Sequence, residues 1–503
     1  MAKKSFLKIK FISCFCICLS QVIFSACSEN QSQLDNAIKE VTEIKILSNT
    51  SEAEKNSMLA EPDLSYEVPK NSPGIKISLT GYEPADQKIA VLEGSILPAQ
   101  FKVYNKESGM CVLNGETKIR ECTEDGEIKS AVADFSSITA PGIYYMETDI
   151  LGRSYDFEIK EGAKDELIKA AFDGLRKLHS EDDLNEVCLE DDPDIFIDVS
   201  GGWITSKDGS KDVIEACLGL QDILTALDYY PKAFGDDFGY EYSGNSIPDI
   251  LDEAFYEADW LLKMQNPETG GVYTQVSFLE SGEDNEKNFV VFGETTKATA
   301  YFCTTMARLS YISEKYDKDY SLKALSAANK AWKCLEANKD LVQSEQYYRA
   351  AVEMYRATGY NLYKTVVEDY LKENASKPFE SRIALDAAID YLDSSRGTNV
   401  DYCTELMANF MSRTEEKSQA SKESRYYVEP GVSDESELLR NTFELIIVDY
   451  IISNKEYATI EENYIQYFTG RNPECRICDE LAYSPDAYVE FLALVCKVKT
   501  VTG

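Results

Sequence analysis

The sequence predicts two folded bodies in a chain of 503 residues, a β-sandwich followed by a larger all-α body. Between residues 74 and 162, apolar and polar residues alternate in short runs that turn residues separate. From residue 163 to the end, apolar residues recur at the helical period instead. A hydrophobic content of 44%, with 32 Tyr and 21 Phe, is sufficient to build a sizeable core for each body, which excludes a wholly disordered chain.

The sandwich is predicted from strands whose side chains alternate in character. Pro and Gly fall between these runs, as the turns of a sandwich require. The expected strands cover residues 75–79, 88–92, 100–104, 142–147 and 155–159.

The all-α body is predicted from a series of amphipathic segments. It is too large for a plain four-helix bundle, so an α/α toroid or a helical repeat array fits better, although no fixed-period repeat is visible. The expected helices cover residues 249–264, 297–315, 321–337, 344–358, 363–373, 379–394, 438–453 and 457–468.

The N-terminus has the features of an export signal. Residues 1–26 contain four lysines and no acid, with an apolar run from Phe11 to Phe24 that is too short to span a bilayer comfortably. The run ends at Ser25-Ala26-Cys27, which resembles a bacterial lipobox in which the cysteine is lipidated. A plain signal peptide cut nearby is the alternative. Residues 27–73 are polar and predict a flexible tether, so we expect an exported protein that is lipid-anchored at the outer face of a bacterial membrane.

The charge balance limits the function. There are 51 Lys and Arg against 88 Asp and Glu, which gives a net charge of −37 and excludes a nucleic-acid partner, since the surface repels phosphate. The only histidine is His179, so His-rich metal cages and Ser-His-Asp chemistry are disfavoured. Cys475-Arg-Ile-Cys478 has no second CxxC, and we predict no metal there. Chemistry by carboxylates, or no chemistry, remains.

Several strings along the chain point to one family. In order, they are Leu79-Thr-Gly-Tyr82, Pro141-Gly-Ile-Tyr144, Asp198-Val-Ser-Gly-Gly-Trp203, Ile247-Pro-Asp-Ile-Leu-Asp-Glu253, Gly270-Gly-Val-Tyr273, Glu353-Met-Tyr-Arg-Ala-Thr-Gly359 and Gly470-Arg-Asn-Pro473. Together they resemble glycoside hydrolase family 9 of the endoglucanase type, with the immunoglobulin-like domain that precedes its catalytic domain. The resemblance covers roughly residues 74–500 and implies an immunoglobulin-like β-sandwich at 74–162 and an (α/α)6 barrel at 163–503.

The resemblance also implies the catalytic carboxylates. Inverting hydrolysis needs one carboxylate as base on a water and one carboxylic acid on the leaving oxygen. The family's Asp-Ala-Gly-Asp segment falls on residues 205–208, which puts the base on Asp208 and replaces the first aspartate by Thr205. The family's Glu-Val-Ala-Ile-Asn-Trp-Asn-Ala resembles residues 480–487, which puts the general acid on Glu480. Trp203 is the candidate substrate-binding residue, with packing in the core as its alternative role.

Two departures from the family pattern bear on activity. The family's His-His-Arg segment, which contacts the sugar, is missing between Pro473 and Glu480, and Lys207 places a cation beside the proposed base. The resemblance therefore implies a cellulase-like hydrolase of β-linked polysaccharides, weakened by the loss of the family aspartate at Thr205 and of the His-His-Arg segment. The alternative is an inactive surface glycan-binding protein on the same scaffold. No cofactor is expected, and the structural calcium common in the family cannot be assigned to residues here.

Overall fold

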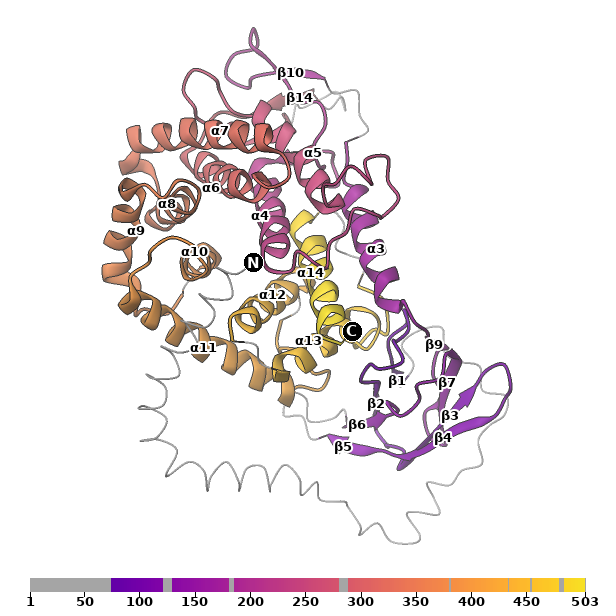
Figure 1. Cartoon of the computed structure of the whole chain (residues 1–503). Coiled ribbons are helices and arrows are strands. Elements are labelled where there is room, and N and C mark those ends of the chain that lie inside the picture. The colour runs from indigo at the N-terminus through magenta and orange to yellow at the C-terminus, as the bar shows by residue number, and fades with distance from the viewer. Residues whose placement is uncertain are drawn as a thin grey trace. The chain divides into compact units, whose positions relative to one another are not determined.

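The computed structural model describes residues 74–120, 129–180, 185–279, 288–379, 381–432, 434–452, 455–478 and 484–502. Within these residues a β-rich region is followed by a helical one, as Figure 1 shows, so the predicted fold class is confirmed. In the described part of the chain, no helix combines the length and apolar composition that crossing a membrane requires.

The β-rich region is a sandwich of two sheets. One sheet has the order β1-β2-β6-β5, and the other has the order β4-β3-β7-β8 with β9 paired to β7. Their facing sides bury a core that includes Phe101, Phe135 and Phe157, with Tyr82 packed edge-on against the last two rings. The strands are β1 (Ile75–Lys76), β2 (Ile89–Gly94), β3 (Gln100–Asn105), β4 (Cys111–Glu116), β5 (Lys118–Arg120), β6 (Lys129–Asp134), β7 (Gly142–Thr148), β8 (Gly152–Arg153) and β9 (Phe157–Ile159).

The helices form an inner and an outer layer. Inner helices pack in sequence, α4 on α6, α6 on α8 and α8 on α10, while α14 packs on both α12 and α4. Each inner helix also packs against an outer neighbour, as α6 does on α7 and α8 on α9. The helices are α3 (Ala163–Arg176), α4 (Val213–Tyr229), α5 (Asp249–Lys263), α6 (Thr296–Ser313), α7 (Lys318–Ala337), α8 (Ser344–Thr358), α9 (Asn361–Asn374), α10 (Arg382–Leu392), α11 (Val400–Glu423), α12 (Glu435–Ile452), α13 (Lys455–Phe468) and α14 (Pro485–Thr502).

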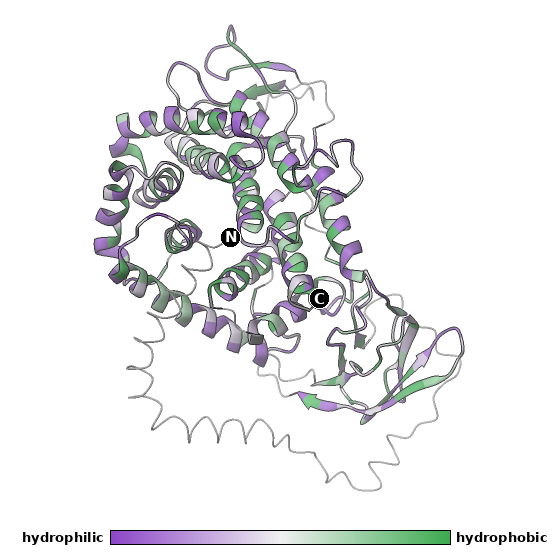
Figure 2. Ribbon diagram, in the orientation of Figure 1, coloured by the Kyte–Doolittle hydropathy of each residue, from purple (hydrophilic) through white to green (hydrophobic). Residues whose placement is uncertain are grey.

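The two layers differ in how hydrophobic residues are distributed. Along α4 almost every side chain from Ala216 to Leu227 is buried, because this helix has neighbours on all sides. Along α7 the buried residues form a single stripe, from Ala324 to Leu335, and the rest of the helix is hydrophilic (Figure 2). An α/α barrel requires this division, since only outer helices have a solvent-facing side.

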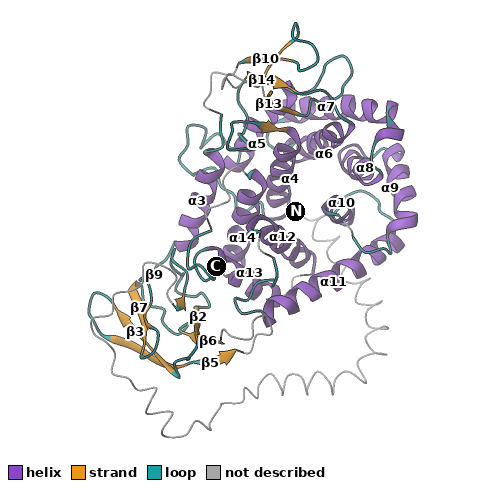
Figure 3. Cartoon of the chain, turned by 180° about the vertical axis from the view of Figure 1, so that it is seen from behind, coloured by secondary structure: helices purple, strands orange, loops and turns teal. Residues whose placement is uncertain are grey.

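Short strands also occur outside the sandwich. β12 (Lys211–Asp212), β13 (Gln275–Leu279) and β14 (Asn288–Val291) form one antiparallel sheet. β10 (Glu186–Cys188) pairs with β11 (Phe196–Asp198). Figure 3 shows β10, β13 and β14 together beside α5 and α7. The sheet matters for function because β12 leads directly into α4.

The string Gly470-Arg-Asn-Pro473 joins the helical region to the sandwich. Thr469 O accepts from Leu79 N at 2.7 Å, and Pro473 O accepts from Lys76 Nζ at 2.6 Å. Gly470 has a φ of +135°, and a Cβ there would lie 2.6 Å from Leu79 Cγ. Glycine is therefore required at 470 by the close approach of the sandwich.

Candidate active site

Charged side chains gather where the inner helices begin. Arg382, at the start of α10, and Arg440 of α12 both bond the same Asp486 oxygen at the start of α14, at 3.2 and 3.1 Å. Arg349 of α8 donates to Asp386 of α10 at 2.7 Å. These contacts join α8, α10, α12 and α14 at one end of the barrel.

The segment that carries Asp208 enters α4 at this end. β12 pairs with β13, which fixes the segment's exit, and Asp212 caps α4 by accepting from the N–H groups of Ile214 and Glu215. Asp208 itself is half-buried, and its Oδ1 accepts from Ser210 N at 2.9 Å. The carboxylate is thus oriented by backbone within a tight turn rather than left to sample solvent freely.

Thr205 lies in the same turn and forms two of its hydrogen bonds. Its N–H donates to Ser210 O at 3.0 Å, and its hydroxyl oxygen accepts from Asp212 N at 2.9 Å. The hydroxyl therefore closes the turn that holds Asp208, and it brings no negative charge to the site.

Trp203 precedes this turn and lies in the core. Its side chain is 0% exposed. Its indole Nε1 donates to Glu253 Oε1 at 2.8 Å, and its backbone N donates to Glu257 Oε2 at 2.6 Å. Burial raises the pKa of Glu257 to about 8, although the bond from Trp203 and the charge of Lys211 favour ionisation. The indole offers no face to a sugar here, and Trp203 anchors the start of the loop.

Arg382 contacts several carboxylates of the charged cluster. Its Nη2 bonds both oxygens of Asp222 at 2.6 Å and lies 3.6 Å from Glu490 Oε1. Burial raises the pKa of Asp222 to about 6. Burial also acts to raise the pKa of Asp486, but Arg382, Arg440 and the hydrogen bonds that Asp486 accepts together hold it below its usual range. One guanidinium thus compensates several buried carboxylates.

Glu215, in the first turn of α4, faces the same cluster. Its side chain is exposed, and among the described residues its carboxylate has no hydrogen-bond partner. Burial in its surroundings, followed by the charges of Asp486 and Asp212, raises its pKa. An accessible carboxyl that retains its proton above the usual range is suited to proton transfer.

This arrangement has known counterparts. The family model described as glycosyl hydrolase family 9 matches residues 171–476, and the cellulase N-terminal ig-like domain matches residues 70–153. The chain belongs to glycosyl hydrolase family 9. The family 9 match includes Asp208 and ends before Glu480.

Curated relatives of this family 9 chain include endoglucanases. It is 26% identical over 350 residues to a xyloglucan-specific endo-β-1,4-glucanase of Bacteroides ovatus, and the match covers 58% of each chain. It is 25% identical over 458 residues to endoglucanase D of Acetivibrio thermocellus, which covers 79% of this chain and 71% of that one. The chain thus spans less than two thirds of the Bacteroides enzyme.

Solved family 9 structures share the fold. The match to a Bacteroides ovatus family 9 protein has a TM-score of 0.73 at 18% identity and covers 86% of this chain and 99% of that one. A metagenome-derived family 9 endoglucanase matches with a TM-score of 0.74 at 20% identity, over 84% of this chain and 99% of that one. Sandwich and barrel are both within this shared fold.

Asp208 and Trp203 are the predicted site residues that the structure describes. Asp208 lies at the charged barrel end. Glu480 and Cys27 lie outside the described residues, so their roles stay predictions. On either side of Glu480 the chain is held in place, because Cys478 N donates to Phe468 O at 2.8 Å and Ser484 Oγ donates to Asp486 Oδ1 at 2.7 Å.

Sequence reasoning missed the residues that surround these candidates. Glu215 and Arg382 come from helices whose first turns meet only in the folded barrel. For Asp486 a signal existed, since it stands where the family string has an asparagine. A carboxylate in place of a neutral amide indicates a local charge that needs a partner, which Arg382 and Arg440 supply.

Two carboxylate groups among the described residues are close enough to share a cation. One consists of Asp222, Asp486 and Glu490, which already surround Arg382. The other consists of Asp236, Asp249 and Asp252, at the start of α5. Burial raises the pKa of Asp252 to about 6. Oxygen ligands of this kind suit Ca²⁺, which would tie the loop before α5 to that helix.

Proposed function

We propose that the chain is an inverting glycoside hydrolase of β-1,4-linked glucans, with Asp208 as general base and Glu480 as general acid. The observation that carries the proposal is the place of Asp208, on a backbone-held turn at the charged end of a family 9 barrel. The substrate class is supported by the curated relatives, which are a xyloglucan-specific endo-β-1,4-glucanase and endoglucanase D.

The chemistry divides between the two carboxylates. Asp208, ionised, takes a proton from a water, and that water attacks the anomeric carbon from the face opposite the leaving group. Glu480, protonated, gives its proton to the leaving oxygen. Inversion requires the two carboxyl groups to stand about 6.5–9.5 Å apart, which leaves room for the water.

The charged cluster holds the start of α14, which follows the proposed acid in the sequence. Asp486, in the first turn of α14, receives bonds from Arg382, Arg440 and Ser484. Glu480 lies outside the described residues, four positions before Ser484 in the sequence. Glu215 is a further carboxyl at this end and can tune the charge that the substrate meets.

A glycan-binding protein without turnover is the second candidate. The observation that favours it is Thr205, whose hydroxyl is used to close the turn and supplies no carboxylate to hold the attacking water. On this hypothesis the cleft keeps its affinity for glucan and the chemical step is lost. The fold alone cannot separate the two candidates, since function depends on the site.

Reducing-sugar release from β-1,4- and mixed-linked glucans separates them. The full chain is compared with Asp208→Asn and Glu480→Gln, each of which should lower the rate about 10²–10⁴-fold if it removes acid–base catalysis. Asp194→Asn and Glu268→Gln, at exposed positions, are matched controls and should keep the rate. Glucan binding without release, in the wild type and every variant, would establish the binding protein instead.

We also propose export and lipid anchoring through Cys27 at the outer face of a bacterial membrane. The support is the apolar run and the Ser25-Ala26-Cys27 ending. In a bacterial host, the wild type should incorporate labelled fatty acid and sediment with membranes. Cys27→Ala should do neither. Equal sedimentation of the two proteins would refute lipidation at this residue.

A further inference from the structure

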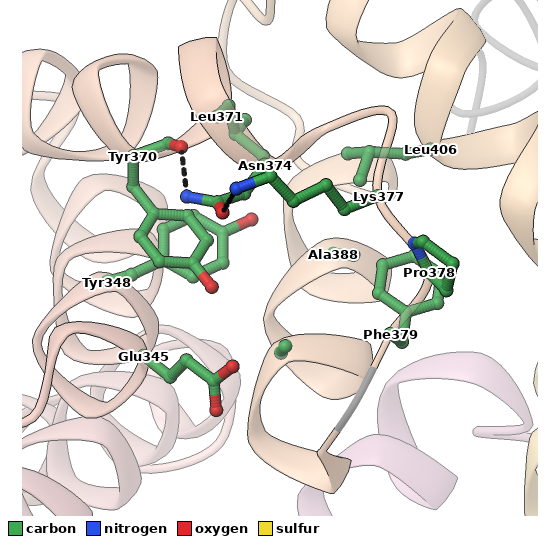
Figure 4. A pocket seen from close by; sticks show the side chains of 11 residues that line it. Glu345, Tyr348, Tyr370, Leu371, Asn374, Lys377, Pro378, Phe379, Ala388 and Leu406 are labelled. Atoms are coloured by element: carbon green, nitrogen blue, oxygen red, sulfur yellow. Dashed lines mark hydrogen bonds between the residues drawn. The ribbon is translucent and has the colours of Figure 1, made fainter.

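A pocket of about 170 Å³ lies between the inner and outer helices, away from the Asp208 turn. α8 and α10 of the inner layer and α9 and α11 of the outer layer enclose it, together with the connection from α9 to α10. Figure 4 shows its lining side chains. A cavity of about 150 Å³ already takes up a six-membered ring, so this one has room for a ring with substituents near its mouth.

Two tyrosines form one wall of the pocket. Tyr348 and Tyr370 stack with centroids 4.1 Å apart and an interplanar angle of 12°. Tyr348 is 1% exposed, and its hydroxyl has no hydrogen-bond partner among the described residues. A buried phenol without a partner is costly to leave unpaired, which points to a polar group that arrives with a ligand or water.

The remaining walls carry both polar and apolar groups. Pro378 and Phe379 face the tyrosines across the pocket in Figure 4, and Glu345 lies below them. Glu345 Oε2 accepts from Ser381 Oγ at 2.5 Å, and its Oε1 has no hydrogen-bond partner among the described residues. A flat apolar surface beside carboxylate, phenol and amide groups is the lining that a pyranose ring needs, since a sugar has apolar C–H faces and a rim of hydroxyls.

Charge favours a neutral ligand. Lys377 bonds Asn374 Oδ1 at 2.9 Å, and among the described residues neither Lys377 nor Glu345 has an ion-pair partner. An anionic ligand would meet Glu345 and the net charge of −37, and a cationic ligand would meet Lys377. A neutral polyol avoids both costs.

We propose that this pocket is a second sugar site, which receives one neutral pyranose unit at the end of a glycan, separate from the site of hydrolysis. The choice of a glucose-type ring rests on the proposed function, whereas the pocket and its unpaired phenol do not. A terminal sugar held there would tether the glycan to the barrel while another part of the chain reaches Asp208.

The test is a titration of the full chain with methyl β-D-glucopyranoside, in which saturation-transfer NMR measures the binding. Tyr348→Phe removes one oxygen and keeps the ring stack, and it should weaken binding about two- to tenfold. Ala388→Leu fills the pocket and should abolish the same binding. Tyr347→Phe is the matched control, because this neighbouring buried tyrosine stacks on Trp332 and does not line the pocket, so its affinity should equal that of the wild type.

Equal affinity in the wild type and Tyr348→Phe would overturn the proposal, and this variant decides alone if Ala388→Leu does not fold. Binding of cyclohexanol without binding of the glycoside would also overturn it, by showing an apolar cavity only. No turnover is needed for the titration. A chain that binds the glycoside but releases no reducing sugar would therefore retain this site and lose the proposed hydrolase.

Discussion

The buried carboxyl of Glu257 binds the backbone of Trp203, at the start of the loop that carries Asp208, and a substitution can test this contact. Its carboxyl is 0% exposed, Oε2 accepts from Trp203 N at 2.6 Å, and Oε1 has no partner among the described residues. Burial raises its pKa from 4.5 to about 8. We predict that Glu257→Gln stabilises the protein at neutral pH, because an amide oxygen can still accept from Trp203 and no charge has to be buried or neutralised.

The magnitude follows from the two pKa values. For a carboxyl whose pKa is raised on folding, stability is fully present below the unfolded value near 4.5 and is lost as pH rises through the folded value near 8. At 1.36 kcal/mol per pKa unit, the loss is about 1 kcal/mol at pH 5 and about 3 kcal/mol at pH 7. The variant Glu257→Gln avoids this loss. Its advantage in the free energy of unfolding over the wild type should therefore be about 2 kcal/mol larger at pH 7 than at pH 5.

Urea unfolding at the two pH values measures this difference. Glu268→Gln, an exposed change just beyond the same helix, is the control and should shift neither value. If Glu257→Gln destabilises the protein at pH 7, or shifts stability equally at both pH values, then Glu257 is not a buried acid that folding forces toward its neutral form.

Three further predictions concern the barrel end. Arg382→Met leaves Asp222 and Asp486 buried without their main cation and should cost about 3–5 kcal/mol in urea unfolding, and a loss below 1 kcal/mol would contradict that role. Thr205→Asp restores a carboxylate that can still accept from Asp212 N, so reducing-sugar release should rise; an unchanged rate would show that Thr205 does not limit hydrolysis. Glu215→Gln removes a carboxyl whose pKa is raised, so a step in the pH–rate profile above the ordinary glutamate range should vanish, and an identical profile would exclude Glu215 from the titrating groups.

The helical period identified helices of both layers. The predicted helix at 344–358 coincides with α8 of the inner layer, and the one at 249–264 ends one residue beyond α5 of the outer layer. α4 and α14 of the inner layer and α3 and α11 of the outer layer were not among the predicted helices. In α4, burial nearly all round leaves no polar stripe to set a period. Strands β4 and β6 of the sandwich were missed as well.

The sequence also predicted only part of the candidate site. A local string placed Asp208 beside Trp203, and the structure adds that the turn is closed by Thr205. The role of Trp203 could not be predicted from the sequence, because an aromatic residue next to a catalytic string is compatible with sugar stacking or with packing in the core. In this structure Trp203 is buried and bonds Glu253 and Glu257, which lie 50 and 54 positions along the chain, so its role is packing.

By itself, the sequence determined the order of sandwich and barrel, the acidic character of the protein, and the family that its strings resemble, because all three are written in local patterns and composition. Only the tertiary structure decided which charges meet. Arg382 reaches Asp222 and Asp486 across 160 and 104 positions, and Tyr348 meets Tyr370 across a layer boundary. Such pairings depend on how the helices close into a barrel, and the local periodicity of the sequence does not specify which helices become neighbours.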